Sequence, residues 1–305
     1  MRDFTLEARI EEMTEKHRTT MTNSLMDKIG TAETGERQVV IGEKEQPEPI
    51  ICNFCKGELH FKKVTGSFDF YKTPDRCSCE KAKKYWGIYD KRIAEINSEC
   101  EEIEKKERRR IEVNRLIKTS HLGRRFKNRT FDTFEINEQN KAAFQISYDY
   151  ASNFKEYEKE GKGLLYTGTV GTGKTHLAAA IANHLIKEKV IPVKFGNVTT
   201  LLSEIRSTYN GVTEATEGDV IRKLSTVNLL IIDDLGKENV TDWTNSMIYT
   251  IINNRYENYK PLIVTTNLGL GELEDAIGIA TLSRLIEMCE GVKVDGVDYR
   301  KAKLM

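Results

Sequence analysis

A glycine-rich octapeptide, GTVGTGKT at residues 168–175, constrains this chain more than any other stretch of its sequence. It follows an apolar run at 164–166 and precedes an alanine-rich stretch at 176–186 that suits a helix. This order of strand, loop and helix is the context in which the pattern G-x-x-x-x-G-K-[ST] cradles phosphate groups. The octapeptide therefore predicts a nucleoside triphosphate site, and a glycine-rich turn that matches by chance is the weaker interpretation.

The residue types within the loop suit separate parts of a bound nucleotide. Glycines let the backbone approach phosphate oxygens closely, with its N–H groups pointing inward. Lys174 would place its ammonium between the β- and γ-phosphates, and the hydroxyl of Thr175 would hold Mg²⁺. The candidate nucleotide-binding residues are Gly168, Thr169, Val170, Gly171, Thr172, Gly173, Lys174, Thr175 and His176.

Two aspartates end a second apolar run, LLIIDDLG at 229–236. A continuously apolar run of this kind is typical of a strand buried on both faces of a parallel sheet. Asp233 would reach Mg²⁺ directly or through water, and Asp234 is placed to polarise the attacking water as a general base. The alternative is a strand end followed by a turn. This alternative is disfavoured because the phosphate loop lies in the same domain.

A third apolar strand, predicted at 262–266, ends in Asn267. An amide at this place can orient the hydrolytic water and sense whether the γ-phosphate is present. Thr265 and Thr266 can equally be ordinary strand residues, because threonine favours β structure. We therefore predict a sensor role for Asn267.

Helical and strand patterns alternate from residue 140 onward. The predicted strands lie at 163–168, 191–195, 228–233, 262–266 and 292–295. The predicted helices, apart from the one after the phosphate loop, lie at 139–157, 199–209, 242–259 and 280–289. Five strands with crossover helices imply an α/β fold with a parallel, doubly wound sheet. Only residues 296–305 follow the last strand, so we expect no helical lid domain.

Four of the six cysteines form two close pairs, Cys52 with Cys55 and Cys77 with Cys79. Disulfides are disfavoured in a reducing cytosol, and paired cysteines at this spacing are typical of a tetrahedral Zn²⁺ site. Four thiolates leave no open coordination position, so the predicted zinc is structural. The C-x-C arrangement of the second pair is unusual, so His60 could replace one of its thiolates. The alternative, four small buried residues, fits two tight pairs poorly.

Composition limits the classes of protein that this chain can belong to. No apolar stretch approaches the length of a transmembrane helix, and the N-terminus lacks the apolar core of a signal peptide. We therefore expect a cytoplasmic protein without a membrane partner. The formal charge is zero overall, yet residues 51–130 hold 21 basic against 12 acidic side chains, a net charge of +9. An anionic partner is expected there, although a solvated charged helix explains much of the segment.

We predict three regions along the chain. Residues 1–50 would form a helix at 3–29 and a polar linker. Residues 51–120 would form the cysteine module and a long charged helix from about residue 80 to residue 118. Residues 121–305 would form the nucleotide-binding domain, entered through a basic, aromatic connector at 120–134 whose phenylalanines could line the adenine pocket or simply pack in the core.

These residues resemble the DnaC/DnaI-type AAA+ replicative helicase loaders of bacteria and phages, whose ATPase domain is similar to that of the IstB-like ATP-binding proteins. The resemblance covers about 125–305 and rests on GTVGTGKTH, LLIIDDLG, the Thr-Thr-Asn strand and Asp298-Tyr299-Arg300. It implies an AAA+ domain with a five-stranded parallel sheet and no helical lid, preceded by a smaller zinc-binding, helical N-terminal domain. It also implies ATP as the nucleotide, in agreement with the lack of a guanine-reading N-K-x-D element.

The resemblance assigns roles to further residues. Arg284 matches the arginine finger that enters a neighbouring subunit, which implies self-association, and Arg300 matches the sensor II arginine that contacts the γ-phosphate. Both could be plain surface arginines, and Arg255 competes with Arg284 for the interface. The segment at 197–224 matches one that contacts single-stranded DNA. Its candidate contact residues are Arg206, Tyr209, Arg222 and Lys223.

The resulting hypothesis is an ATP-dependent loader for DNA replication that grips a hexameric replicative helicase through its N-terminal region and delivers it to single-stranded DNA. Its ATPase would be weak until a partner or single-stranded DNA stimulates it. An IstB-like transposition helper ATPase is the first alternative, and a zinc-containing DNA-binding protein with a vestigial ATPase is the second. The predicted catalytic residues are Lys174, Asp233, Asp234, Asn267, Arg284 and Arg300. The predicted metal ligands are Cys52, Cys55, Cys77 and Cys79 for zinc and Thr175 and Asp233 for magnesium.

Overall fold

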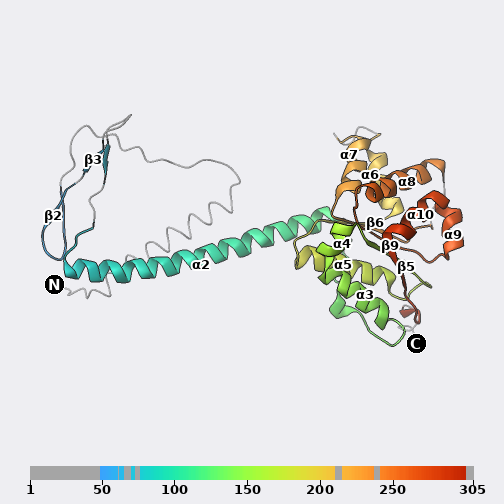
Figure 1. Cartoon of the computed structure of the whole chain (residues 1–305), viewed down its shortest axis with the longest axis horizontal. Coiled ribbons are helices and arrows are strands. Elements are labelled where there is room, and N and C mark those ends of the chain that lie inside the picture. The colour runs from blue at the N-terminus through green and yellow to red at the C-terminus, as the bar shows by residue number, and fades with distance from the viewer. Residues whose placement is uncertain are drawn as a thin grey trace. The chain divides into compact units, whose positions relative to one another are not determined.

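Contacts within the chain divide it into two units, Met1–Arg108 and Arg109–Met305 (Figure 1). The boundary falls inside one long helix, α2 (Glu80–Thr119), which confirms the charged helix predicted from about residue 80 to residue 118. The computed structural model describes residues 49–60, 62–64, 70–72, 76–209, 215–236 and 241–299. The helix predicted at 3–29 and the candidate sensor Arg300 lie outside the described residues.

The second unit is built on a five-stranded sheet with the order β6-β7-β8-β5-β9. All of its strand pairs are parallel, which confirms the predicted parallel α/β sheet. The last strand begins at residue 289 rather than 292 because its pairing with β5 starts where Gly163 meets Cys289. The strands are β5 (Gly163–Thr167), β6 (Val193–Asn197), β7 (Leu229–Asp233), β8 (Leu262–Thr265) and β9 (Cys289–Lys293).

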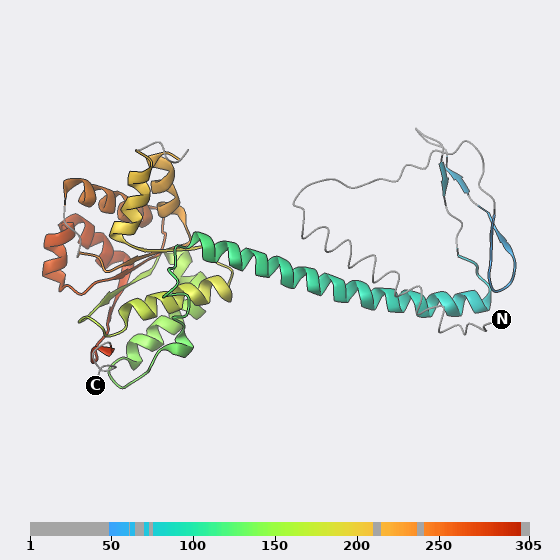
Figure 2. The same ribbon diagram turned by 180° about the vertical axis from the view of Figure 1, so that it is seen from behind.

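Helices cover both faces of this sheet (Figure 2). On one face lie the short 3-10 helix η1 (Phe131–Thr133), α3 (Lys141–Ser152), α4 (Phe154–Glu160) and α5 (Lys174–Lys187). On the other face lie α6 (Val198–Ser207), α7 (Glu217–Thr226), α8 (Asp242–Glu257), α9 (Leu270–Ile277) and α10 (Ile279–Met288). Among the residues that the structure describes, none of the helices combines the length and the apolar character needed to cross a membrane.

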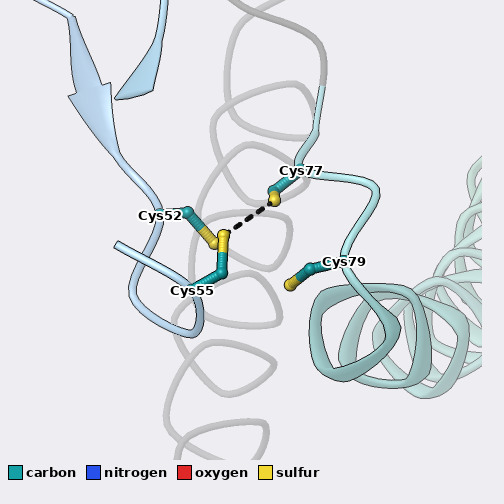
Figure 3. A group of neighbouring side chains, drawn as sticks. All are labelled: Cys52, Cys55, Cys77 and Cys79. Carbon is teal, nitrogen blue, oxygen red and sulfur yellow. Dashed lines mark hydrogen bonds between the residues drawn. The ribbon is translucent and has the colours of Figure 1, made fainter. Parts of the chain in front are cut away.

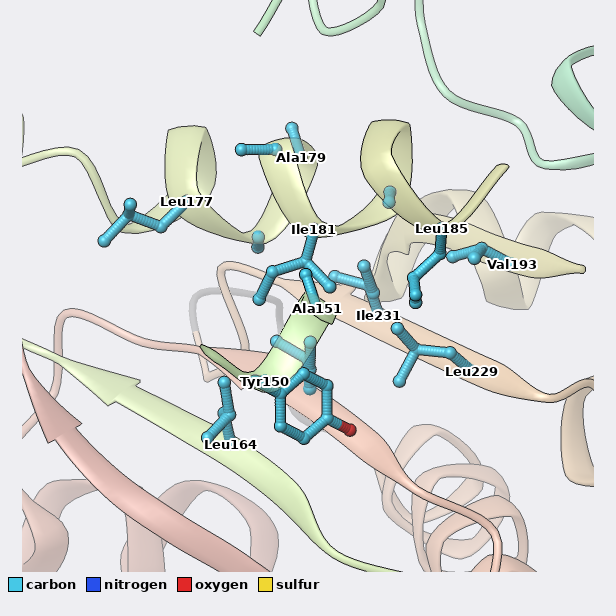
Figure 4. Packing of buried hydrophobic residues seen from close by; sticks show 14 of the residues in the cluster. Tyr150, Ala151, Leu164, Leu177, Ala179, Ile181, Leu185, Val193, Leu229 and Ile231 are labelled. Carbon is cyan, nitrogen blue, oxygen red and sulfur yellow. The ribbon is translucent and has the colours of Figure 1, made fainter. Parts of the chain in front are cut away.

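The strand β7 is apolar at every position before its aspartate because both of its faces are buried. Leu229 and Ile231 pack against Ile181 and Leu185 of α5 on one face (Figure 4). Leu230 and Ile232 face the opposite core, formed with α6, α8 and α10. This two-sided core fixes the strand ends, where the polar residues of the predicted site lie.

Three helices differ from the expected pattern. The helix predicted at 139–157 is two helices, because Asn153 leaves the helical conformation with φ of −108° and ψ of 21°. The sequence pattern did not predict α7 or α9. Both are short, and α7 begins with a capping box in which Thr216 and Asp219 satisfy each other's backbone N–H groups.

Among its described residues, the first unit contains two short antiparallel strand pairs followed by the first part of α2. The pairs are β1 (Ile50–Ile51) with β2 (Glu58–Leu59) and β3 (Lys62–Val64) with β4 (Phe70–Lys72). At the start of α2 the Arg76 guanidinium lies 4.2 Å from the centre of the Trp86 ring and donates twice to Asp90, at 2.7 and 2.6 Å. These contacts tie the strand region to the first turns of the helix.

Candidate functional site

The glycine-rich loop adopts backbone angles that only glycine takes readily. Gly168, Gly171 and Gly173 have φ values of 138°, 83° and 108°. A Cβ at Gly168 would lie 2.3 Å from the carbonyl oxygen of Val294, and one at Gly171 would lie 2.0 Å from a carboxylate oxygen of Asp298. The helix α5 begins at Lys174, within this loop, and the N-terminus of a helix is a place where anions bind.

Lys174 is buried beneath the loop and connects it to the end of β8. Its ammonium donates to the carbonyl oxygens of Gly168 and Thr169 and to Oδ1 of Asn267, each at 2.7 Å. The Nδ2 of Asn267 in turn donates to Oδ1 of Asp234 at 2.7 Å. One amide therefore bridges the cation of the loop and the second aspartate of β7.

A threonine beside the first aspartate belongs to the same site. Oδ1 of Asp233 accepts hydrogen bonds from the hydroxyls of Thr175 at 2.8 Å and Thr265 at 2.7 Å. Carboxylate and hydroxyl oxygens are the hard ligands that Mg²⁺ prefers, so Thr175 and Asp233 fit such an ion. Thr265 also accepts from the backbone N–H of Asp234 at 2.9 Å. Sequence reasoning left open whether Thr265 is a site residue or an ordinary strand residue, and it did not identify this double role.

The order of the strands explains why these side chains meet. β7, β8 and β5 are parallel neighbours, so their carboxyl ends lie at one edge of the sheet. Ligand sites of open parallel sheets form at that edge. Lys174, Asp233, Asp234 and Asn267, far apart in sequence, are therefore brought together. Asp234 has a positive φ of 61°, a left-handed conformation that aspartate tolerates better than most residues.

The connector before α3 packs on the start of α5. Nε2 of His176 donates to the carbonyl oxygen of Thr130 at 3.0 Å and lies 3.2 Å from Oγ1 of Thr133. The rings of Phe134 and His176 meet edge to face at 5.1 Å, and a Cβ at Gly173 would lie 2.8 Å from the Phe134 ring. Burial lowers the pKa of His176. Phe134 is a buried core residue that also borders the loop.

Arg255 is not available to a neighbouring subunit, contrary to its candidacy for the interface. It is fully buried, and its guanidinium donates to the carbonyl oxygens of Leu224 at 2.7 Å, Val227 at 3.0 Å and Pro261 at 2.6 Å. Burial lowers its pKa to about 9. This side chain holds together the loops that lead into β7 and β8.

Arg284 lies on α10, where α8 holds its guanidinium in place. Its Nε donates to Oδ1 of Asn253 at 2.7 Å, and one terminal nitrogen donates to the hydroxyl of Tyr249 at 3.1 Å. The guanidinium also lies 4.9 Å from the centre of the Tyr249 ring, a cation–π contact. Its position on an outer helix is compatible with an action on another molecule.

Three candidate DNA-contacting residues have partners within the chain. The Arg206 guanidinium lies 4.6 Å from the centre of the Trp243 ring. Arg222 donates to Oδ1 of Asp219 at 2.7 Å, and the hydroxyl of Tyr209 donates to Glu217. Binding a phosphate backbone through these residues would require exchange of the present contacts.

The two cysteine pairs converge in the first unit (Figure 3). The sulfurs of Cys52, Cys55, Cys77 and Cys79 all lie within 4.8 Å of one another, and those of Cys55 and Cys77 are 3.5 Å apart. Tetrahedral zinc, with Zn–S bonds of about 2.3 Å, holds its sulfurs about 3.8 Å apart. The four thiols therefore fit a zinc ion. His60 is outside this group: its Nε2 lies 3.6 Å from a Glu58 carboxylate oxygen.

The pKa values of two of these thiols are shifted in opposite directions. The backbone amides of Cys55 and Phe54 lower the pKa of Cys52 to about 6. The amide of Cys79 lowers the pKa of Cys77, but hydrogen bonds from its thiol to Cys55 and Cys52 outweigh this and raise the pKa to about 12. Several thiolates this close repel one another, so a divalent cation is the natural means of keeping all of them ionised.

Comparison with known proteins identifies the family. Residues 88–304 match the IstB-like ATP binding protein family. The chain belongs to this family. The replicative helicase loader DnaC of Buchnera aphidicola subsp. Baizongia pistaciae is 30% identical over 176 residues, 57% of this chain and 70% of that protein. A crystal structure of the DnaC helicase loader, 28% identical, covers 57% of this chain and 100% of the solved chain with a TM-score of 0.52.

These matches confirm the resemblance to DnaC/DnaI-type helicase loaders and the corresponding AAA+ fold. The uncharacterized protein YqaM of Bacillus subtilis is 30% identical over 222 residues, which are 70% of this chain. The match spans 65% of YqaM, slightly less than two thirds of its length. The shared family therefore establishes an ATP-binding protein, and the activity and partners of the whole chain are inferred below.

Proposed function

We propose that this chain is an ATP-dependent helicase loader of DNA replication. The observation that carries the proposal is the hydrogen-bonded set around the loop, in which Asn267 bridges Lys174 and Asp234 while Thr175 binds Asp233. All of these residue types suit a working ATPase, and the family contains relatives named as replicative helicase loaders. An intact set disfavours a protein whose ATPase is vestigial.

Nucleotide binding would rearrange the contacts of the loop. The phosphates of ATP would accept hydrogen bonds from the loop amides and the first N–H groups of α5. Lys174 would exchange the carbonyl oxygens of Gly168 and Thr169 for phosphate oxygens. Thr175 and Asp233 would hold Mg²⁺, which when bound neutralises charge on the β- and γ-phosphates.

Hydrolysis would use the second aspartate and its amide partner. Asp234 would accept a proton from the water that attacks the γ-phosphorus as the bond to the β-phosphate oxygen breaks. Asn267, already 2.7 Å from Asp234, would fix the position of that carboxylate and of the water. Arg284 of a neighbouring copy and Arg300 would stabilise the charge on the transferred group. Because Arg284 would have to come from another copy, we expect weak activity in the isolated chain.

Replacing Asp234 tests this assignment. Asp234→Asn should lower the turnover of ATP about 100-fold while the dissociation constant of ATP changes less than about threefold, because the carboxylate acts on water rather than on the bound phosphates. Asp275→Asn, on the exposed surface of α9, is the matched control. Phosphate release and ATP binding are measured on the same preparations. Undiminished turnover in Asp234→Asn would remove this residue from the mechanism.

The part of the chain up to the end of α2 and the part after it would have different tasks. Residues 1–50 and the zinc-binding module at 51–120 would grip a hexameric replicative helicase. The ATPase domain at 121–305 would self-associate through Arg284 and contact single-stranded DNA through the segment at 197–224. ATP would act as an assembly switch whose hydrolysis releases the helicase. Such a protein would work in the cytoplasm, where replicating DNA is found.

The partner protein that this chain binds, a replicative helicase or a transposase, decides between this proposal and the alternative of a transposition helper. The full chain should co-purify with the replicative helicase of its own cell, and native mass spectrometry should show a stoichiometric complex. The match to the IstB-like family favours a transposition helper as the second candidate. That candidate predicts a complex with a transposase and none with the helicase.

A further inference from the structure

The hydroxyl of Tyr299 has three hydrogen-bond partners in residues 135–140, the segment directly before α3. It donates to the carbonyl oxygen of Glu135 at 3.0 Å and accepts from the side-chain amides of Asn137 at 2.9 Å and Asn140 at 3.3 Å. A phenol has one proton to donate and two lone pairs. Three partners therefore use its whole hydrogen-bonding capacity.

The partners of Tyr299 are themselves held in place. Asn140 is fully buried; its Nδ2 donates to the Glu135 carbonyl oxygen at 3.0 Å and its Oδ1 accepts from the Asn137 backbone at 2.8 Å. Oδ1 of Asn137 in turn accepts from the Asn140 backbone at 3.0 Å. These bonds do not involve Tyr299, so residues 135–140 form a preformed socket for its hydroxyl.

The segment that carries Tyr299 runs along the phosphate loop. The backbone N–H of Val294 donates to Thr167 at 2.8 Å, and that of Tyr299 donates to the carbonyl oxygen of Gly171 at 3.2 Å. Between these bonds the Asp298 carboxylate lies against Gly171, where a Cβ would be 2.0 Å from its oxygen. Residues 294–299 thus contact the start of the loop, beside Gly168, and its middle, at Gly171.

We infer that Tyr299 is a positioning residue for the phosphate loop. Its socket fixes the segment 294–299, and this segment holds the loop at Gly171 in the conformation that receives phosphates. Glycine-rich loops have many accessible conformations, so a loop held in advance binds its ligand with less loss of entropy. This role rests on the proposed nucleotide binding and is independent of the client protein.

Tyr299→Phe removes the hydroxyl and keeps the ring, so it isolates the socket bonds. The dissociation constants of ATP and ADP should both rise about fivefold to tenfold, because the loop contacts phosphates that both nucleotides share. Turnover at saturating ATP should stay near the starting value, since Asp234 and Asn267 follow β7 and β8 and have no bond to the socket of Tyr299 among the hydrogen bonds described above. Tyr259→Phe, at a ring that is 70% exposed, is the matched control.

A second variant distinguishes positioning from loss of general stability. Asn137→Ala removes one bond to the Tyr299 hydroxyl together with the bonds that Oδ1 of Asn137 accepts within the socket, so it should also raise both dissociation constants. The double variant should be no weaker than the weaker of the two single variants, because both changes act through one set of bonds.

Titration calorimetry with ATP and ADP on the full chain, together with thermal unfolding without nucleotide, provides the readouts. Unchanged dissociation constants in Tyr299→Phe, or a drop in melting temperature without weaker binding, would overturn the positioning role. Lys174→Ala tests the nucleotide site itself and should lose ATP binding. If Lys174→Ala loses binding while Tyr299→Phe does not, the Tyr299 role fails and the nucleotide site stands.

Discussion

The α/β unit and the cysteine module reach a fixed conformation by different physical means. The α/β unit buries strands such as β7 between two apolar layers, and its polar site lies at the edge of that core. The described strands of the cysteine module are two or three residues long. Strand pairs this short are not stable alone in water, and small units commonly depend on a metal for their stability.

Because of this difference, the two candidate ligands, the nucleotide and zinc, would have different effects on the protein. A nucleotide would bind to a scaffold that is already complete, so its arrival can act as a signal. Zinc would be part of the scaffold in the module, so its removal would act as unfolding. The comparison predicts that a substitution in the cysteine module leaves ATP binding intact, and that a substitution in the α/β unit leaves zinc binding intact.

The largest expected effect is the loss of the module in Cys52→Ser. Apparent zinc-binding free energies of about 10–16 kcal/mol commonly provide the folding free energy of such units, so three thiolates should not hold it. Zinc content should fall and proteolysis before α2 should increase, while the dissociation constant of ATP changes less than about twofold. Cys100→Ser, at a partly buried position of α2, is the control. Parallel loss of ATP binding would break the proposed independence of the units.

Arg255→Met should produce the largest loss of stability in the α/β unit. It leaves the carbonyl oxygens of Leu224, Val227 and Pro261 buried without their donor. The free energy of unfolding should fall by about 3–5 kcal/mol. Urea denaturation measures it, with the exposed Arg222→Met as the control, expected to change it by less than about 1 kcal/mol. An equal loss in both variants would contradict the structural role of Arg255.

Lys174→Ala should weaken ATP binding at least about 100-fold, because it removes the cation that phosphate oxygens would contact. The zinc content and the melting of the module should not change. Titration calorimetry and metal analysis on the same sample test both statements, and Lys189→Ala on the surface near the end of α5 is the control. Retained affinity in Lys174→Ala would argue that the loop is not the nucleotide site.

The smallest expected effect is a pH dependence of the α/β unit. Burial lowers the pKa of His121, His176 and His184 below the unfolded value of 6.5. The unfolded chain then takes up protons first as the pH falls, so this stability is complete above about pH 6.5 and declines below it. Each contribution should stay below about 1 kcal/mol after solvent screening. Urea unfolding from pH 7.5 to 5.5 should show a shallower decline in His176→Gln, and an unchanged slope would exclude His176 as a source.

The strands of the α/β unit were more predictable than the contacts of its side chains. Continuous apolar runs identified β5, β7 and β8 because burial on both faces leaves a signal within the strand itself. The short helices α7 (ten residues) and α9 (eight residues) were missed, although the capping box at Thr216 was a usable signal. The Asp233 contact of Thr265 had no sequence signal of its own, since threonine is common in strands.

In the cysteine module, the sequence predicted the cluster but could not settle which residues belong to it. The spacing of Cys52, Cys55, Cys77 and Cys79 indicated a shared site, and the sulfurs do converge. The choice between His60 and a cysteine as a metal ligand required the fold, because both lie close enough in sequence to contribute. The exposed position of His60 beside Glu58 decides it.

The family, the parallel sheet and the phosphate loop could be predicted from the residues, because these depend on local patterns of glycine, charge and apolar residues. Three facts needed the folded chain: Arg255 is a buried support, Asn267 bridges Lys174 and Asp234, and Tyr299 occupies a socket beside the loop. Each of these facts depends on segments far apart in the chain meeting in space. Whether a polar side chain is exposed or bonded in the core is set by those partners, which its neighbours in sequence do not specify.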